Sequence, residues 1–137
     1  MPKTFQIVAR RDLSQIGSAK PVLVEIGVPR RRRLGEWACR YRITGLDSSR
    51  IRYCFGFDAV QALQIVNQAI WHDLKPYGEK LSWLGEPGDT GFFLHFPSTL
   101  GLKFARHVES VIDREVRKEY LRLKRAHTRL KRRSQSR

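Results

Sequence analysis

The sequence predicts an α+β fold: an antiparallel sheet of four or five strands, one helix packed on a face, and a long basic C-terminal helix. Period-two alternation recurs through the first 56 residues, whereas spacings of three and four recur in residues 58–75 and again beyond residue 101. A chain of 137 residues suits one hydrophobic core better than two. We therefore expect a core domain over residues 1–100 and a basic helix and tail over residues 101–137.

Four segments alternate as strands do, and short connections make them an antiparallel meander: residues 4–10, 21–28, 37–44 and 51–55. The second is the clearest, because Val22, Val24, Ile26 and Val28 share one face. Between the second and third strands, residues 29–35 contain four consecutive arginines and predict an exposed hairpin connection.

The register of the last hairpin can be predicted by matching apolar faces, which pairs Tyr41 with Tyr53 and Cys39 with Phe55. Arg42 then lies opposite Arg52 on the outer face. Like charges in that position are mildly destabilising, so either an anion joins them or both side chains turn into solvent. This register also puts Cys39 and Cys54 on opposite faces, so no disulfide is expected between them.

Residues 58–75 predict the helix that packs on the sheet. Asp58 followed by Gln61 is a capping-box pattern. The apolar stripe comprises Ala59, Leu63, Val66, Ile70 and Leu74. Pro76 and Gly78 end the helix. After it we expect a short strand at 81–84, a glycine-rich loop at 85–91 and an edge strand at 92–96.

A second helical pattern runs from Leu102 to Arg132, with one apolar stripe: Ala105, Val108, Ile112, Val116, Tyr120, Leu123, Ala126 and Leu130. Thirty residues reach about 45 Å, more than a small domain needs. We expect the first half to pack on the core domain. The second half either projects, pairs with a second copy as a homodimer, or becomes ordered on a partner.

The net charge of +14 lies almost entirely in two blocks. Residues 30–52 contain eight arginines against Glu36 and Asp47, and residues 117–137 contain ten basic side chains against Glu119 alone. Such blocks are typical of proteins that contact polyanions, and the arginine fork suits phosphate. The expected contacts are Arg30, Arg31, Arg32, Arg33, Arg40, Arg42, Arg52, Arg117, Lys118, Arg122, Lys124, Arg125, Arg129, Lys131, Arg132 and Arg133.

These blocks favour a non-enzymatic protein that binds DNA or RNA through phosphate contacts. The alternative is a protein-binding module, of the inhibitor, immunity or adaptor type, that captures an acidic surface. A solubilising tail, or a basic amphipathic helix that docks on a membrane surface, would explain the same charge. Aromatic support for RNA is weak, because Trp37 and Tyr41 suit the core and no strand predicts an exposed aromatic pair.

Signals of catalysis are poor. The four histidines are widely spaced, and the 85–91 loop lacks the lysine of a phosphate-binding loop. No nucleophile lies near a base in sequence. We therefore expect no enzyme, no metal and no cofactor. Two cysteines do not make a disulfide framework, no apolar run could span a bilayer, and no secretory signal is evident, so a cytoplasmic protein is expected.

Two stretches carry a resemblance: Tyr-Arg-Ile-Thr-Gly-Leu at residues 41–46, and the Asp-x-x-Gln-Ala-Leu helix start at residues 58–63. With Trp83 and Gly91-Phe92, they resemble a family of small bacterial proteins known only as a domain of unknown function. The resemblance covers about residues 1–97 and implies a strand meander, a Gly-Leu turn and a bacterial origin. It implies no activity. The basic helix from residue 101 is an addition to that pattern.

Overall fold

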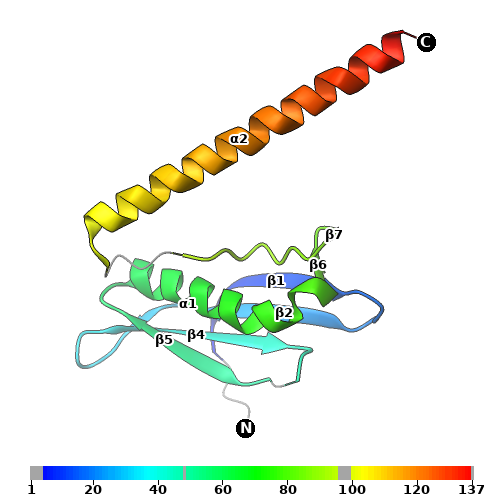
Figure 1. The fold of residues 1–137 in the computed structure, drawn as a ribbon. Helices are drawn as coiled ribbons and strands as arrows, with labels where there is room; N and C mark the ends of the chain where they lie inside the picture. The colour runs from blue at the N-terminus through cyan, green and yellow to red at the C-terminus, as the bar shows by residue number, and fades with distance from the viewer. Residues whose placement is uncertain (1–4, 48, 96–99, 137) are drawn as a thin grey trace. The chain divides into compact units, whose positions relative to one another are not determined.

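The computed structural model describes residues 5–47, 49–95 and 100–136. The chain divides into two compact units, Met1–His95 and Phe96–Arg137, each of which is described by itself. The first unit confirms the predicted α+β class, with an antiparallel sheet and a helix packed on it (Figure 1). The second contains the long helix α2 (Leu102–Gln135).

The sheet has seven strands, more than the four or five expected, because two short strands follow the helix and the arginine-rich connection adds another. The strands are β1 (Ile7–Gln15), β2 (Pro21–Gly27), β3 (Arg30–Arg31), β4 (Trp37–Thr44), β5 (Ile51–Gly56), β6 (Leu81–Trp83) and β7 (Glu86–Pro87). All pairings are antiparallel, in the order β3-β4-β2-β1-β6-β7. β5 pairs with the other edge of β4, opposite β2 and β3.

Helix α1 (Ala59–Leu74) covers β4 and β5 on one face of the sheet. The predicted capping box is confirmed: the Asp58 carboxylate accepts a hydrogen bond from Gln61 N at 2.7 Å, and the Gln61 amide oxygen accepts one from Phe57 N at 2.7 Å. The buried side of the helix comprises Ala62, Val66, Ile70 and Leu74. A 3-10 turn, η1 (Lys75–Lys80), follows at the predicted proline.

Residues after β7 return along the face that carries α1. Phe92 packs against the core, and the guanidinium of Arg11 lies 4.2 Å from the centre of the Trp83 ring and 4.5 Å from that of Phe92. The predicted strand at 81–84 is confirmed as β6. The edge strand predicted at 92–96 is wrong for residues 92–95, which form no ladder; residue 96 lies outside the described residues.

The predicted register of the β4–β5 hairpin is wrong by one residue. Cys39 lies opposite Cys54, Arg40 opposite Tyr53, and Tyr41 opposite Arg52. A one-residue step turns every side chain of a strand to the other face. The argument that the two cysteines lie on opposite faces is therefore wrong, although both are free thiols.

The helix explains why β5 adopts this register. Gly56 faces α1, and a Cβ there would lie 2.5 Å from the backbone nitrogen of Ala62, so only glycine permits the observed approach. On the same face, Arg52 reaches Asp73 of α1. Ile51, Tyr53 and Phe55 of β5 are consequently directed to the face that α1 does not cover.

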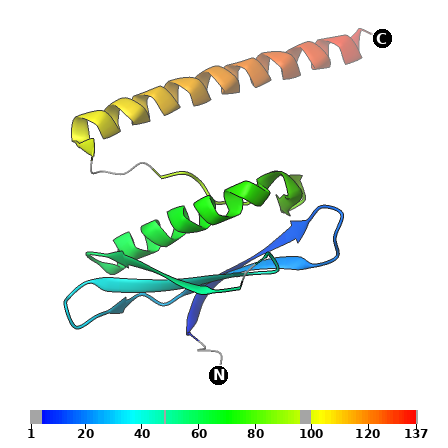
Figure 2. The ribbon, with the colours of Figure 1, turned by 60° about the horizontal axis from the view of Figure 1, so that its bottom comes forward.

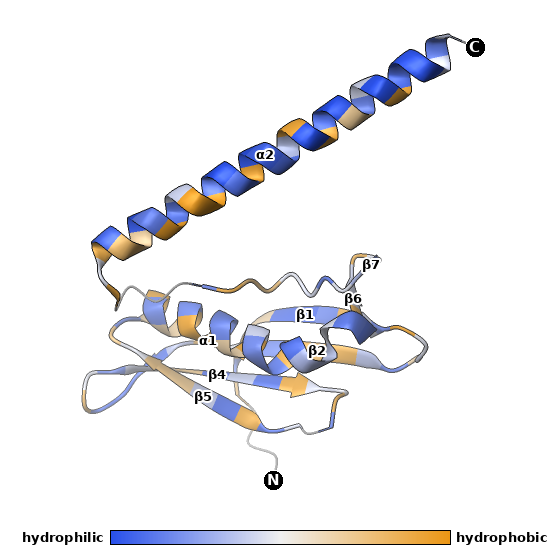
Figure 3. Ribbon diagram, viewed as in Figure 1, coloured by the Kyte–Doolittle hydropathy of each residue, from blue (hydrophilic) through white to orange (hydrophobic). Residues whose placement is uncertain are grey.

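Helix α2 (Leu102–Gln135) confirms the predicted long basic helix. None of its residues is buried, and its apolar stripe is exposed from Ile112 onward. Figure 3 shows apolar segments recurring along an otherwise hydrophilic helix. The expectation that its first half packs on the core domain stays a prediction.

Candidate nucleic-acid interface

The two faces of the sheet differ in what covers them. α1 and the segment that contains Phe92 lie on one face, which we call the covered face. On the opposite, open face, no described element of the first unit is packed (Figure 2). Strand alternation places Arg40 and Arg42 of β4 on the open face, and Tyr53 and Phe55 of β5 follow from their pairing.

A groove of about 670 Å³ lies on the open face beside these side chains. Residues from four separate segments line it, among them Phe5, Arg30, Arg32, Arg40, Tyr53 and Phe55. Gly27 forms part of the floor, and a Cβ there would lie 2.7 Å from the Phe5 ring, which explains why glycine occupies this position. Arg30 and Arg32 of the predicted arginine-rich hairpin therefore meet Arg40 of β4 at one place.

Each aromatic ring of the groove lies near a guanidinium group. The distances from the guanidinium carbon to the ring centre are 5.5 Å for Arg32 and Phe55, and 5.1 Å for Arg40 and Tyr53. Tyr53 is 48% exposed and Phe55 45% exposed. The expectation that no strand carries an exposed aromatic pair is therefore wrong, and the cause is the register of β5.

The sequence did contain a signal for these rings. Gly56 comes two residues before Asp58, the cap of α1, at a point where a small residue suits close packing of a helix on a strand. If Gly56 faces the helix, alternation sends Phe55 and Tyr53 to the opposite face. Matching apolar residues across the hairpin gave more weight to hydrophobicity than to this steric requirement.

Arg42 has a carboxylate partner within the sheet. Its Nε and Nη2 donate hydrogen bonds to Glu25 Oε2 at 2.8 and 2.6 Å, across the β2–β4 pairing. Glu25 is only 8% exposed, so its charge requires this compensation. The predicted Arg42–Arg52 repulsion does not exist, and the anion proposed to relieve it is unnecessary.

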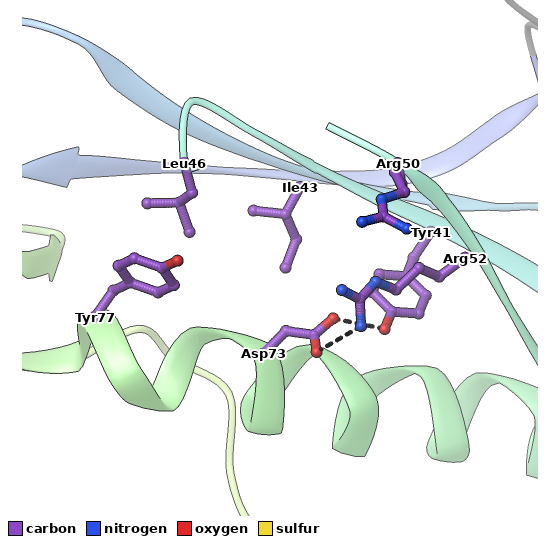
Figure 4. Close-up of a pocket in the computed structure, with 7 residues that line it drawn as sticks. All are labelled: Tyr41, Ile43, Leu46, Arg50, Arg52, Asp73 and Tyr77. Carbon is purple, nitrogen blue, oxygen red and sulfur yellow. Dashed lines mark hydrogen bonds and ion pairs between the residues drawn. The ribbon is translucent and has the colours of Figure 1, made fainter. Parts of the chain in front are cut away.

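Arg52 lies on the covered face. The prediction that it shares one arginine surface with Arg40 and Arg42 is therefore wrong. Arg52 Nη1 donates to Asp73 Oδ1 at 3.0 Å, while the Tyr41 hydroxyl donates to Asp73 Oδ2 at 2.7 Å (Figure 4). Burial and the hydrogen bond to Asp73 both raise the pKa of Tyr41. The cavity beside this triad is small, about 90 Å³, and the triad ties α1 to β4 and β5.

The arginine-rich hairpin contributes Arg30 and Arg32 to the lining of the groove. Arg30 donates to the Gln6 side-chain oxygen at 2.9 Å, and Arg32 lies 3.9 Å from a Glu36 carboxylate oxygen. The turn is closed by Arg32 N donating to the Glu36 carbonyl at 2.8 Å. Arg31 and Arg33 are exposed. Among the described residues, no carboxylate pairs with Arg30, Arg31, Arg33 or Arg40.

Two of the predicted contacts on α2 pair within the helix. Lys118 donates to Glu115 at 2.9 Å, and Arg122 makes a two-point contact with Glu119. These hydrogen bonds lower the pKa of both glutamates. The remaining predicted residues are exposed and pair with no carboxylate of the described chain: Arg117, Lys124, Arg125, Arg129, Lys131, Arg132 and Arg133.

The loop at 85–91 has a structural explanation. The Asp89 carboxylate accepts a hydrogen bond from Gly91 N at 2.7 Å, which is an Asx-type turn. In residues 5–47, 49–95 and 100–136, no three His, Cys, Asp or Glu side chains gather as a metal site would require. Within this same part of the chain, no helix has the uninterrupted apolar length that a membrane span requires.

Fold and surface together define a small α+β domain with an open arginine–aromatic face, followed by a basic amphipathic helix. The chain belongs to the family described as Domain of unknown function (DUF6968), whose model matches residues 9–94. This confirms the resemblance to an uncharacterised domain family. No curated protein and no solved structure matches the chain significantly. The matched residues include β4, β5 and α1, whereas α2 lies outside the match.

Proposed function

We propose that this protein binds nucleic acid through phosphate contacts and catalyses no reaction. The observation that carries the proposal is the convergence of Arg30, Arg32 and Arg40 on one open groove. Neither Arg30 nor Arg40 has a carboxylate partner among the described residues, and that of Arg32 is 3.9 Å away. Their guanidinium groups remain available for the bidentate contacts that phosphate accepts.

Helix α2 provides a second cationic surface, separate from the groove. By the 3.6-residue period, Arg117, Lys124, Arg125 and Arg132 lie on the side of the helix away from the apolar stripe, whereas Lys131 and Arg133 flank the stripe. Lysine and arginine along a helix bind polyanions with little sequence preference and with an affinity that falls steeply with salt. A cytoplasmic location is part of the same proposal, since nucleic acids are met there.

The test is a fluorescence-anisotropy titration of labelled duplex DNA and single-stranded RNA at two salt concentrations. The full-length protein is compared with a groove variant, Arg30→Ala/Arg32→Ala/Arg40→Ala. A matched control, Lys20→Ala/Lys75→Ala/Lys80→Ala, removes the same charge from residues that do not line the groove. We expect the groove variant to lose most of its affinity and about two to three units of the salt slope, because each phosphate contact contributes about 0.7 to 0.9.

A second variant tests whether α2 contributes to binding. In it, six basic residues of the helix are changed to alanine: Lys124, Arg125, Arg129, Lys131, Arg132 and Arg133. We expect this change also to weaken binding and flatten its salt dependence; unchanged affinity would remove α2 from the interface. Equal losses in the groove variant and its lysine control would show that net charge alone drives binding. Wild-type protein that binds no oligonucleotide at low salt would overturn the proposal and favour the acidic protein partner.

A further inference from the structure

Resting on the proposed function, we infer that the open face selects single-stranded nucleic acid, whose bases stack on Tyr53 and Phe55. Phosphate contacts alone do not distinguish a single strand from a duplex. Exposed aromatic rings distinguish the two. A duplex buries the faces of its bases within its own stack, whereas the bases of an unpaired strand are free to stack on a protein.

The spacing of the two rings suits an extended strand. Tyr53 and Phe55 are two residues apart on the same side of β5, about 6.7 Å at the usual rise of a strand. This is about twice the 3.4 Å rise per nucleotide of duplex DNA. Two consecutive bases that occupy both rings must therefore be unstacked from one another, which a single strand permits and a duplex does not.

The arginines stand where the phosphates of such a strand would pass. The guanidinium groups of Arg40 and Arg32 lie 5.1 and 5.5 Å from the ring centres, within the range of cation–π attraction but well beyond ring contact. About half of each ring remains exposed. A base can thus lie on the ring while the neighbouring guanidinium contacts the phosphate. A third ring, that of Phe5, lines the same groove over Gly27.

The experiment separates bases from phosphates. Binding is measured for a labelled single-stranded oligonucleotide, for an oligonucleotide of the same length made of abasic sites, and for the corresponding duplex. Full-length wild type is compared with Tyr53→Leu/Phe55→Leu, which keeps apolar side chains on an exposed edge strand. The control is Phe57→Leu, because Phe57 is 91% exposed and does not line the groove. Thermal unfolding checks that all three proteins are folded.

We expect wild type to bind the base-containing strand at least tenfold more tightly than the abasic one, since stacking on one ring contributes about that factor. The double variant loses this preference and binds both strands equally, its duplex affinity is unchanged, and Phe57→Leu behaves as wild type. Equal, salt-dependent binding of normal and abasic strands by wild type would overturn the inference and leave the proposed function standing. Absence of binding to all three would overturn both.

Discussion

Arginine meets aromatic rings on both faces of this sheet, and the two arrangements differ in geometry and exposure. On the covered face, Arg11 lies 4.2 and 4.5 Å from the ring centres of Trp83 and Phe92, and its Nη1 donates to the Thr90 carbonyl at 3.3 Å. On the open face, Arg40 and Tyr53 are 5.1 Å apart, with half of the ring exposed. The same residue types hold a segment in place on one face and leave groups available on the other.

The covered arrangement depends on one glycine. Gly91 adopts φ +67°, and a Cβ there would lie 2.6 Å from both the Arg11 guanidinium and the Trp83 ring. The chain can therefore lie close over the arginine, which is half-buried. On the open face, Arg32 and Arg40 instead line the groove, whereas Arg42 is paired with Glu25 and lies 5.6 Å from the centre of the Phe5 ring. Coverage, and not residue type, separates the structural cluster from the candidate interface.

The largest expected effect comes from Gly91→Ala, which should destabilise the protein by about 3 kcal/mol, through a positive φ and a clash with packed side chains. The matched control is Gly88→Ala, where φ is +82° but nothing lies within 4 Å, so only the backbone term of about 1 kcal/mol remains. Urea unfolding followed by tryptophan fluorescence measures both. Equal losses in the two variants would contradict the close packing of Gly91 on Arg11.

Replacing Arg11 or Arg40 by alanine should have opposite effects, one on stability and the other on oligonucleotide affinity. Arg11→Ala should lower the unfolding free energy by about 1 to 2 kcal/mol, because two partly buried cation–π contacts are lost, and leave oligonucleotide affinity unchanged. Arg40→Ala should change stability by less than about 0.5 kcal/mol and weaken binding. The measurements are urea unfolding and anisotropy on the same preparations. Loss of affinity in Arg11→Ala without loss of stability would reverse the assignment of the two faces.

A pH titration tests how well α1 excludes water from the covered face. Burial and the neighbouring Cys54 raise the pKa of Cys39 to about 11, whereas the unfolded thiol titrates near 9. Because the raised pKa favours the protonated native state, its stabilisation is complete below pH 9 and is lost as the pH rises towards 11. Wild type should lose about 1 kcal/mol more than Cys39→Val between pH 8 and 10. If the unfolding free energy of wild type and of Cys39→Val, measured by urea unfolding, falls equally with pH, the Cys39 thiol is not shielded from water.

The smallest expected effect concerns the homodimer predicted through α2. The helix exposes its apolar stripe, including Val116, Tyr120, Leu123 and Leu130. If a second copy covers it, Leu123→Arg/Leu130→Arg should shift the protein from dimer to monomer in sedimentation equilibrium. Arg129→Leu, on the basic side, is the control that should not. The open groove should keep its intrinsic affinity and lose only the gain from two linked sites. A monomeric wild-type protein in the same experiment would contradict the predicted homodimer.

Much of the candidate interface followed from residue order. The Arg30–Arg33 hairpin, the placement of Arg40 on the outer face and the basic side of α2 are consequences of local turns, alternation and helical period. Arg42 and Arg52 could not be assigned in the same way, because Glu25 and Asp73 are 17 and 21 residues away from them in sequence. The sequence did not predict that Tyr53 and Phe55 are exposed, because residues that alternate along a strand form the same pattern whichever face of the sheet they occupy.

By itself, the sequence determined the elements: the Asp58 cap and stripe of α1, the length and polarity of α2, and the strands of the meander. These depend on neighbours within a few residues. Tertiary structure alone decided which face of β5 is open, because the pattern of Ile51, Tyr53 and Phe55 satisfies either register. The contact of Gly56 with Ala62, and the ion pair of Arg52 with Asp73, selected one of them. That selection directs the two rings toward Arg32, just after β3, and Arg40 of β4.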